Sequence, residues 1–416
     1  MNVLLIPNTN SFRSYLELAK FLKKKKINYK LLVLHESVER LIIRNKIKTN
    51  IIKHIEPNYY KIYKKRFFFK FFLLLYYSLK FHLIAKIDLK KYNFDNIIVA
   101  GDRETSLKLS IIKIANQKKI QVYNYLTSIT ASKEMLKISR NNNPNFFIKK
   151  NSFTYKFFKK FTYPNNEDKR KTIIFYDKVH IYINYLLNIL PNNPWIPSGG
   201  GSDIFLAETE IIKKLEMQKG CKKNIYVVGS VDQDNIKNSY KPKKNNKKKI
   251  AILLTHWHEH GLKNIAEHQH RNETLCEYLY KYNFNKRNEY YLYLHPKQKM
   301  NNYNWVKKYN IKIFHKPISV DFLNIDLIIL SFSSSIVAWA LEHKIKIIIA
   351  NYFKEKHTIF RSNKISYANN LLKLNYILKK NLKKINMKKT KSYKKVRNED
   401  KFSNKIYKIL MFRGEI

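Results

Sequence analysis

Short apolar runs alternate with segments of helical spacing along most of this chain, and this alternation limits its fold more than any other feature. Continuous apolar runs are typical of strands that are buried on both faces of a parallel sheet. The runs that predict buried strands are residues 3–6, 31–34, 97–100, 204–207, 225–228, 250–254, 290–294, 326–330 and 345–350. The segments that predict helices between them are residues 13–24, 106–117, 208–218 and 335–344. The chain is therefore predicted to be an α/β protein built on parallel sheets.

A basic run, KPKKNNKKK at residues 241–249, interrupts this pattern and is typical of a surface linker. We therefore predict an N-terminal α/β domain over residues 1–240, with an insertion at about 145–193, and a C-terminal α/β domain over 246–385. A basic tail or helix is expected over 386–416. Binding sites in such sheets lie beyond the carboxyl ends of the strands, and a cleft is expected between two such domains.

Composition excludes several classes of protein. The 82 Lys and Arg residues against 30 Asp and Glu give a net charge of +52. The basic residues are spread along the whole chain, which argues against a dedicated nucleic-acid site. Two cysteines, Cys221 and Cys276, are too few for a disulfide framework or a four-thiolate zinc site. The N-terminal MNVLLIPNTN lacks the pattern of a secretion signal, so a cytoplasmic protein is expected.

Residues 66–88 are aromatic and apolar, but Lys70, Lys80, His82 and Lys86 interrupt them. A membrane-spanning helix needs about 20 apolar residues with few charges. Two interpretations remain open for this segment. It is either a helix packed on the sheet or a patch that lies on an anionic membrane surface.

Asp102 is the first candidate site residue. An apolar run over 97–100 leads into Gly101, Asp102, Arg103 and Glu104. A carboxylate at such a strand end can act as an acid or base, or can bind a sugar hydroxyl. The alternative is that Asp102 caps the helix that follows.

A histidine cluster follows the run at 250–254: His256, His258, Glu259 and His260 come directly after Thr255. In one interpretation, His256 donates hydrogen bonds to a bound diphosphate. In the other, the cluster is similar to the T-H-x-H-x-D-H motif of metallo-β-lactamase-fold hydrolases, with Glu259 in place of the Asp. That fold requires mixed sheets and further metal ligands at set distances.

Two further strand ends carry groups that suit a phosphate. His295 ends the run at 290–294 and is held in a turn by Pro296. Ser333, Ser334 and Ser335 follow the run at 326–330 and precede a helical segment. Serine hydroxyls and backbone N–H groups at a helix N-terminus form a ready anion site, although serine also caps helices without any ligand.

These segments resemble the UDP-N-acetylglucosamine 2-epimerase family, which has the two-Rossmann glycosyltransferase-B architecture. The resemblance rests on the order of five segments: 101–104, 203–208, 228–235, 255–259 and the His295–Pro296 pair. It implies that Asp102 is the strand-end acid or base. It also matches His256 to the His of T-x-H-R-R-E-N, and His295 to the His of the H-P turn.

The chain departs from that family at three motifs. PNTNSFR at residues 7–13 replaces G-T-R-P-E, and YLTS at 125–128 replaces the carboxylate-bearing V-E-A-G. FSSSIVAW at 332–339 keeps a serine of D-S-G-G-x-x-E-E but none of its acids. Epimerisation needs groups that remove and replace protons, so these losses count against it.

His295–Pro296 together with Ser333–Ser335 also resembles the H-P and S-S motifs of bacterial sialyltransferases and capsule glycosyltransferases, in which the His and serines engage the nucleotide phosphate. The chain is therefore predicted to be a metal-independent glycosyltransferase of capsule or lipopolysaccharide biosynthesis. The catalytic candidates are Asp102, His256 and His295, and the phosphate-binding candidates are Ser333, Ser334 and Ser335 with the two histidines. Arg103, Glu104 and Glu259 are weaker candidates for sugar binding.

The expected ligands are a UDP- or CMP-linked sugar and a glycan or lipid-linked acceptor, with no cofactor, metal or nucleic acid. The enzyme is expected in the cytoplasm, at the inner face of the membrane if residues 66–88 contact lipid. The alternatives are a UDP-N-acetylglucosamine 2-epimerase, a metallo-β-lactamase-like hydrolase that uses residues 255–260, and a protein that binds a nucleotide or glycan without turnover.

Overall fold

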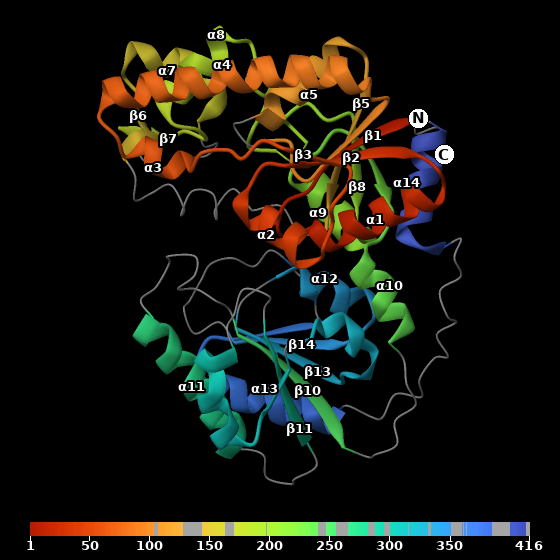
Figure 1. The fold of residues 1–416 in the computed structure, drawn as a ribbon. Helices are drawn as coiled ribbons and strands as arrows, with labels where there is room; N and C mark the ends of the chain where they lie inside the picture. Colours follow the sequence, from red (N-terminus) through yellow and green to blue (C-terminus); the bar gives the residue numbers. More distant parts are fainter. Residues whose placement is uncertain are drawn as a thin grey trace. The chain divides into compact units, whose positions relative to one another are not determined.

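The computed structural model describes residues 1–103, 107–127, 144–162, 170–196, 198–239, 247–254, 265–281, 288–294, 300–314, 316–331, 334–350, 360, 362, 364–384 and 400–412 (Figure 1). The chain forms two compact units. Unit 1 comprises Met1–Val231 and Glu399–Ile416, and unit 2 comprises Asp232–Asn398. The division falls at the start of helix α10 (Val231–Asn238), several residues before the basic run that marks the predicted boundary.

Unit 1 is built on a parallel sheet with the strand order β3-β2-β1-β4-β5-β8-β9. Its strands are β1 (Asn2–Ile6), β2 (Asn28–Val33), β3 (Ile51–Lys53), β4 (Asn96–Val99), β5 (Gln121–Leu126), β8 (Ile204–Ala207) and β9 (Asn224–Val227). Every described pairing in this sheet is parallel. The carboxyl ends of these strands therefore share one edge of the sheet.

Helices cover both faces of this sheet. Leu4 and Ile6 of β1 pack with Phe81 and Leu89 of α4 (Phe67–Tyr92) on one face, where α5 (Leu107–Gln117) also contributes. On the other face, Val33 of β2 packs with α1 (Phe12–Lys24) and α2 (Glu36–Arg44). The remaining helices of the N-terminal part are α3 (Tyr59–Tyr63) and α9 (Glu210–Gln218). Burial on both faces explains why these strands read as continuous apolar runs.

The predicted insertion forms a small subdomain against α4. It contains η1 (Pro144–Phe146), β6 (Phe147–Lys149), α7 (Phe153–Phe158), η2 (Lys159–Phe161), β7 (Lys171–Ile173) and α8 (Lys178–Leu186). Strands β6 and β7 pair antiparallel, and their apolar side chains share a core with Leu74 of α4. Two buried polar contacts secure this core. Lys70 of α4 donates to Asp177 at 3.1 Å, and the hydroxyl of Tyr63 lies 2.9 Å from Nδ1 of His180.

Unit 2 is built on a second parallel sheet, with the order β12-β11-β10-β13-β14-β15. Its strands are β10 (Lys248–Leu253), β11 (Asn288–Tyr293), β12 (Lys312–Phe314), β13 (Leu327–Leu330), β14 (Lys346–Ala350) and β15 (Ile365–Ala368). Its longer helices are α11 (Ile265–Lys281), η4 (Met300–Tyr309), α12 (Ser335–Glu342) and α13 (Leu371–Lys384). Leu275, Val306 and Leu374 from three of these elements pack on the apolar face of the sheet.

The C-terminal helix α14 (Phe402–Met411) returns to unit 1 and packs on α1. Phe402 stacks on Tyr125 of β5, with 6.4 Å between ring centroids. Tyr407 meets Phe21 of α1 edge to face at 6.0 Å. Ile406 and Leu410 are buried as well. The end of the chain therefore forms part of the core of unit 1, whereas the sequence predicts only a basic tail or helix over residues 386–416.

The structure confirms the α/β class, the parallel sheets and each of the strands and helices predicted from apolar runs and helical spacing. The sequence misses β5, because Asn124 interrupts its apolar pattern, and it misses the short strands β3, β12 and β15. Asn124 is fully buried, and its amide is satisfied by hydrogen bonds, so a central strand tolerates it.

The buried histidine of the insertion gives a testable pH dependence. Burial lowers the pKa of His180 to about 3, from an ordinary 6.5. Below pH 6.5 His180 is protonated in the unfolded chain but stays neutral in the folded core. The free energy of unfolding therefore decreases as the pH is lowered, until the pH reaches the pKa of His180 in the folded state. Between pH 7.5 and 5.0, urea denaturation of the wild type should show about 2 kcal/mol more loss of stability than the variant His180→Gln. Equal losses in the two proteins would contradict this assignment.

Candidate functional site

The carboxyl edge of each parallel sheet is the expected place for a site. In unit 1 the loops after β1, β4, β5, β8 and β9 leave from this edge. In unit 2 the neighbouring strands β11, β10 and β13 end together, at Tyr293, Leu253 and Leu330. The candidates predicted from the sequence follow these ends.

Asp102 lies beyond β4 in a buried group of polar side chains. Its Oδ2 accepts hydrogen bonds from the hydroxyl of Ser202 at 2.7 Å, from the backbone N–H of Ser202 at 3.3 Å and from that of Gly200 at 3.2 Å. Its Oδ1 accepts from the amide of Asn124 at 3.3 Å. Asn124 also accepts from the N–H of Gly101 and donates to Ser198. Asp102, Asn124 and Ser202 are each at most 1% exposed.

The glycine run before β8 is required by this contact. A Cβ atom on Gly200 would lie 1.4 Å from the backbone oxygen of Asp102, and one on Gly199 would lie 1.7 Å from that of Asn193. Gly201 has a φ of +118°, which L-amino acids with side chains rarely adopt. The run therefore lets the backbone approach the end of β4 closely enough to hydrogen-bond with Asp102.

This geometry gives Asp102 a role in joining the end of β4 to β5 and to the segment that precedes β8. Its carboxylate is turned into the protein and is 0% exposed, so its predicted role as acid or base stays a prediction. Arg103, a candidate for sugar binding, donates to the backbone oxygen of Pro194 at 3.2 Å. The hydroxyl of Tyr176 donates to the backbone oxygen of Arg103 at 2.5 Å. Both contacts tie the end of β4 to the insertion and to the segment that follows it.

Tyr125 lies next to Leu126, the position at which the epimerase resemblance implies the Glu of V-E-A-G. Its ring stacks on Tyr15 of α1 at 5.6 Å and on Phe402 of α14. Its hydroxyl donates to the backbone oxygen of Gly229 at 3.0 Å, while the hydroxyl of Tyr15 donates to the backbone oxygen of Tyr125 at 3.1 Å. Burial raises the pKa of Tyr15 well above its usual value. Tyr125 is therefore part of an aromatic stack, while the buried Leu126 stands at the position of the family's Glu and supplies no ionisable acid.

Glu208 and Ser230 form a second buried polar pair at the same edge. Glu208 follows β8 and Ser230 follows β9, and both side chains are at most 2% exposed. The hydroxyl of Ser230 donates to Oε1 of Glu208. Nearby, the N–H of Val231 donates to the hydroxyl of Ser14 of α1 at 3.3 Å. The sequence marks this segment only through the epimerase resemblance, because neither residue belongs to a motif of its own.

Several predicted site residues lie outside the described part of the chain. These are Glu104, His256, His258, Glu259, His260, His295 and Ser333. The described strands that precede the second-unit candidates are β10, β11 and β13, which are neighbours in the sheet. The roles predicted for these seven residues stay predictions.

Ser334, one of the predicted phosphate-binding serines, lies between β13 and α12. Its backbone is extended, with φ −141° and ψ 176°, as at the N-cap of a helix, but its side chain makes no capping hydrogen bond. Its hydroxyl oxygen is buried and has no hydrogen-bond partner among the described residues. Ser335 begins α12. The first N–H groups of a helix lack intrahelical acceptors, so this turn can accept an anion.

Among the described residues, no group of three or more His, Cys, Asp or Glu side chains could hold a metal ion. Cys221 and Cys276 are both buried free thiols, and burial raises the pKa of each. Neither thiol is therefore suited to be a nucleophile. The pairings of the second sheet are parallel throughout the described strands, which is not the mixed sheet that the metallo-hydrolase alternative requires.

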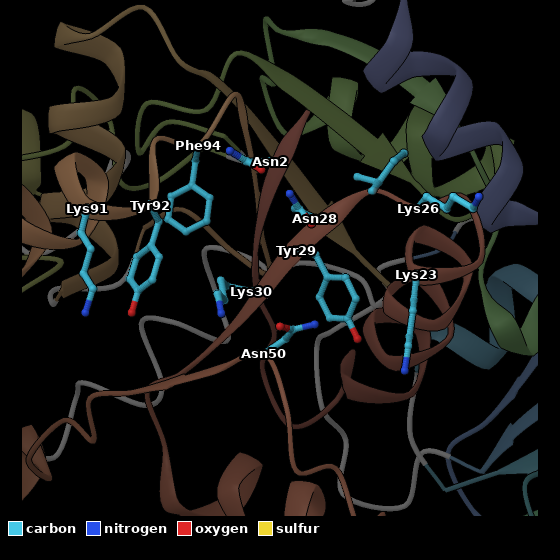
Figure 2. A pocket seen from close by; sticks show the side chains of 11 residues that line it. Asn2, Lys23, Lys26, Asn28, Tyr29, Lys30, Asn50, Lys91, Tyr92 and Phe94 are labelled. Carbon is cyan, nitrogen blue, oxygen red and sulfur yellow. The ribbon is translucent and has the colours of Figure 1, made fainter.

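A positively charged pocket of about 580 Å³ lies at the amino end of the first sheet, beside Asn2 of β1 and Asn28 of β2. Figure 2 shows Lys91 and Tyr92 on one side of it and Lys23 and Lys26 on the other. Lys30 also lines the pocket, and its ammonium lies 5.6 Å from the centre of the Tyr92 ring. This pocket is at the opposite end of the strands from Asp102. No sequence motif marks it, because its residues come from the ends of separate helices and strands and from the turns beside them.

Comparison with known proteins gives the class of fold. No family model matches the chain, and no curated protein matches its sequence. Among solved structures, the calicheamicin glycosyltransferase CalG4 is 8% identical, with 99% of this chain and 94% of that chain covered at a TM-score of 0.54. The glycotransferase of kitacinnamycin is 9% identical, with 99% and 95% covered at a TM-score of 0.50. The UDP-GlcNAc 2-epimerase from Neisseria meningitidis, solved with UDP-GlcNAc, is 13% identical, with 99% and 100% covered at 0.49.

The two glycosyltransferases extend over nearly the whole chain, so the fold is of the glycosyltransferase-B class, with two Rossmann-like domains. This confirms the predicted fold class. Identities this low establish the fold alone, and activity must be argued from the site.

The buried hydrogen bonds of Asp102 predict a stability effect. The carboxylate of Asp102 accepts hydrogen bonds from four donors. In Asp102→Asn an NH2 group replaces one of the two carboxylate oxygens, so at least one of these buried donors loses its acceptor. We expect a loss of about 3 kcal/mol in the free energy of unfolding, measured by urea denaturation. The control Asp95→Asn, at a carboxylate that is 55% exposed, should cost less than about 1 kcal/mol. If Asp102→Asn kept wild-type stability, the structural role given to this carboxylate would be wrong.

Proposed function

We propose that this chain is a metal-independent glycosyltransferase that uses a nucleotide sugar in cell-surface glycan assembly, such as capsule or lipopolysaccharide. The observation that carries the proposal is the buried hydroxyl of Ser334 at the start of α12, which none of the described residues hydrogen-bonds. A buried hydroxyl without a partner costs free energy, and a bound acceptor would recover it. A phosphate oxygen at a helix N-terminus is such an acceptor.

The order of the strands supports a phosphate site at this point. Ser334 follows β13, while His256 and His295 follow β10 and β11 within a few residues in the sequence. Because these three strands are neighbours, the segments that carry the serines and the two histidines leave from one part of the sheet edge. In the proposed complex, Ser333–Ser335, the N–H groups of α12 and the two imidazoles hold the phosphate of a UDP- or CMP-linked sugar.

The chemistry that follows is inverting transfer. An acceptor hydroxyl loses its proton to a base, for which Asp102 is the candidate predicted from the sequence, and attacks the anomeric carbon. The bond from that carbon to the phosphate oxygen breaks, so its electron pair and the negative charge pass to the nucleotide. Hydrogen-bond donors that are already in place stabilise this charge without reorganisation. Asp102, Arg103, Glu104 and Glu259 are retained as candidates for the acceptor and sugar side. The acceptor itself is a glycan or a lipid-linked glycan, reached in the cytoplasm at the inner face of the membrane.

Transfer is preferred over epimerisation because of one position in unit 1. Epimerisation at C2 needs an acid or base that removes and replaces protons. At the position where the epimerase resemblance implies a Glu, this chain has the buried Leu126, and the neighbouring Tyr125 is stacked with Tyr15 and Phe402. A UDP-N-acetylglucosamine 2-epimerase remains the second candidate. The product separates the two, since an epimerase inverts the sugar without an acceptor, whereas a transferase requires one.

Ser334→Ala tests the proposed phosphate site. Without ligand, the variant should be as stable as the wild type or slightly more stable, because the lost hydroxyl has no partner in the described protein. With UDP or CMP, whichever raises the melting temperature of the wild type, its affinity should fall about tenfold, which corresponds to about 1.4 kcal/mol.

The control is Ser239→Ala. This serine is also buried in unit 2, but its hydroxyl donates to the backbone oxygen of Ile236 at 2.8 Å and accepts from the N–H of Leu323. Its loss should lower the stability of the free protein and leave nucleotide affinity unchanged. Wild-type nucleotide affinity in Ser334→Ala would remove the main support for the phosphate site.

Zinc content separates the transferase from the metallo-hydrolase alternative. The transferase needs no metal, so the double variant His256→Ala/His258→Ala should weaken nucleotide binding and leave the zinc content of the purified protein at background. A stoichiometric zinc ion in the wild type that is lost in this variant would favour the hydrolase. Nucleotide binding without any turnover of a sugar would favour the non-catalytic alternative.

A further inference from the structure

Helix α4 (Phe67–Tyr92) presents two unlike faces. One face is buried, and its residues recur every three or four positions: Lys70, Leu74, Ser78, Phe81, Ala85 and Leu89. The opposite face carries an apolar stripe with the same spacing, whose members are between 48% and 74% exposed: Phe68, Phe72, Tyr76, Leu79, Leu83 and Ile87. Phe67 and Phe69 add two exposed rings at its start. The stripe runs for about 28 Å along the helix.

Cationic side chains surround the stripe. Lys65 and Arg66 precede the helix and are exposed. Lys80 and Lys86 are exposed within it, and at 100° per residue they lie at the two borders of the stripe. The only acidic residue of the helix, Asp88, pairs with His54 at 2.9 Å.

The positive charge continues past the end of the helix. The pocket at the amino end of the first sheet is lined by Lys91 and Tyr92, the last two residues of α4. Lys23, Lys26 and Lys30 line the same pocket. An apolar stripe with aromatic residues and a cationic border is the pattern of a helix that lies in the interface of an anionic bilayer. It does not suit a basic protein such as a second copy of this chain, whose net charge is +52.

By length and composition, α4 is also the one helix of the described part of the chain that could cross a membrane. Its packing argues for a position on the membrane instead. The buried face contributes Phe81, Ala85 and Leu89 to the core of the first sheet and Leu74 to that of the insertion. Its Lys70 also pairs with the buried Asp177 at 3.1 Å. In Figure 1 the helix lies along unit 1, next to α5 and α8. A spanning helix would have to give up both cores and the ion pair.

We propose that the exposed stripe of α4 docks unit 1 onto an anionic membrane surface, with the stripe in the interface and the surrounding lysines on lipid phosphates. The proposal deepens the function proposed above, because it brings the enzyme to lipid-linked acceptors. The docking itself does not depend on that function, since it involves no nucleotide and none of the residues assigned to the site.

Vesicle flotation tests the proposal with the full chain. The wild type should float with vesicles of phosphatidylcholine and phosphatidylglycerol in equal parts, and much less with phosphatidylcholine alone. In Phe72→Glu/Leu83→Glu, binding to the anionic vesicles should fall at least tenfold, because two charges enter the stripe. In Lys80→Gln/Lys86→Gln it should fall several-fold and lose part of its salt dependence. The matched control is Leu372→Glu/Tyr376→Glu on α13, whose side chains are 83% and 65% exposed, and it should float like the wild type.

Three results would overturn the proposal. The first is no binding of the wild type to the anionic vesicles. The second is equal binding of the wild type and Phe72→Glu/Leu83→Glu, which would leave the net charge as the whole cause. The third is a wild-type dimer in sedimentation that the same variant converts to a monomer, since a second copy would then cover the stripe. Circular dichroism and nucleotide-induced shifts in melting temperature should match the wild type in every variant, so a failed membrane proposal is distinguishable from a failed nucleotide site.

Discussion

Parallel strand pairing is the constraint on which the rest of this structure depends. A parallel strand can be joined to the next only by a chain that returns over the face of the sheet, so helices cover both faces and every strand ends at the same edge. This brings residues far apart in the sequence together: the hydroxyl of Tyr125, near the end of β5, donates to the backbone oxygen of Gly229, after β9, although 104 residues separate the two. The same rule groups the segments after β10, β11 and β13 in unit 2.

The two sheet edges use their polar groups differently. After the end of β4, the buried carboxylate of Asp102 is satisfied within the protein and links β4 to Asn124 of β5 and to the segment that precedes β8. At the end of β13, the hydroxyl of Ser334 is buried and has no hydrogen-bond partner in the described part of the chain, and its side chain does not cap the helix that follows. Buried polar groups are normally paired. The first arrangement is typical of a scaffold, and we propose that the second is a binding site.

The sequence predicts the part of the fold that depends on local pattern. Continuous apolar runs identify the central strands, because burial on both faces leaves no polar alternation. Strand β5 is not predicted because Asn124 interrupts its apolar run. Its buried amide is satisfied by Gly101, Asp102 and Ser198, which are distant in the sequence, so no local pattern predicts these hydrogen bonds. The packing of α14 on unit 1 is missed for a similar reason. Its partners Phe21 and Tyr125 are hundreds of residues earlier in the sequence.

For the site, the sequence identifies strand ends and residue types but not which groups are already satisfied. Asp102 and Ser334 read alike as polar residues after apolar runs, and only the structure separates the carboxylate with four hydrogen bonds from the hydroxyl with none among the described residues. The sequence of residues 66–88 leaves two interpretations open, a packed helix or a membrane-surface patch. The structure shows that both faces of α4 carry apolar side chains and that only one face is packed.

The central claim is that the turn between β13 and α12 holds the phosphate of a nucleotide. Hydrogen exchange of the backbone amides, with and without UDP or CMP, tests it most directly, because the first N–H groups of α12 have no intrahelical acceptor. The account predicts that saturating nucleotide slows exchange at Ser335 and Ile336. Unchanged exchange there, with slowing instead around the lysine pocket at residues 23–30, would contradict it.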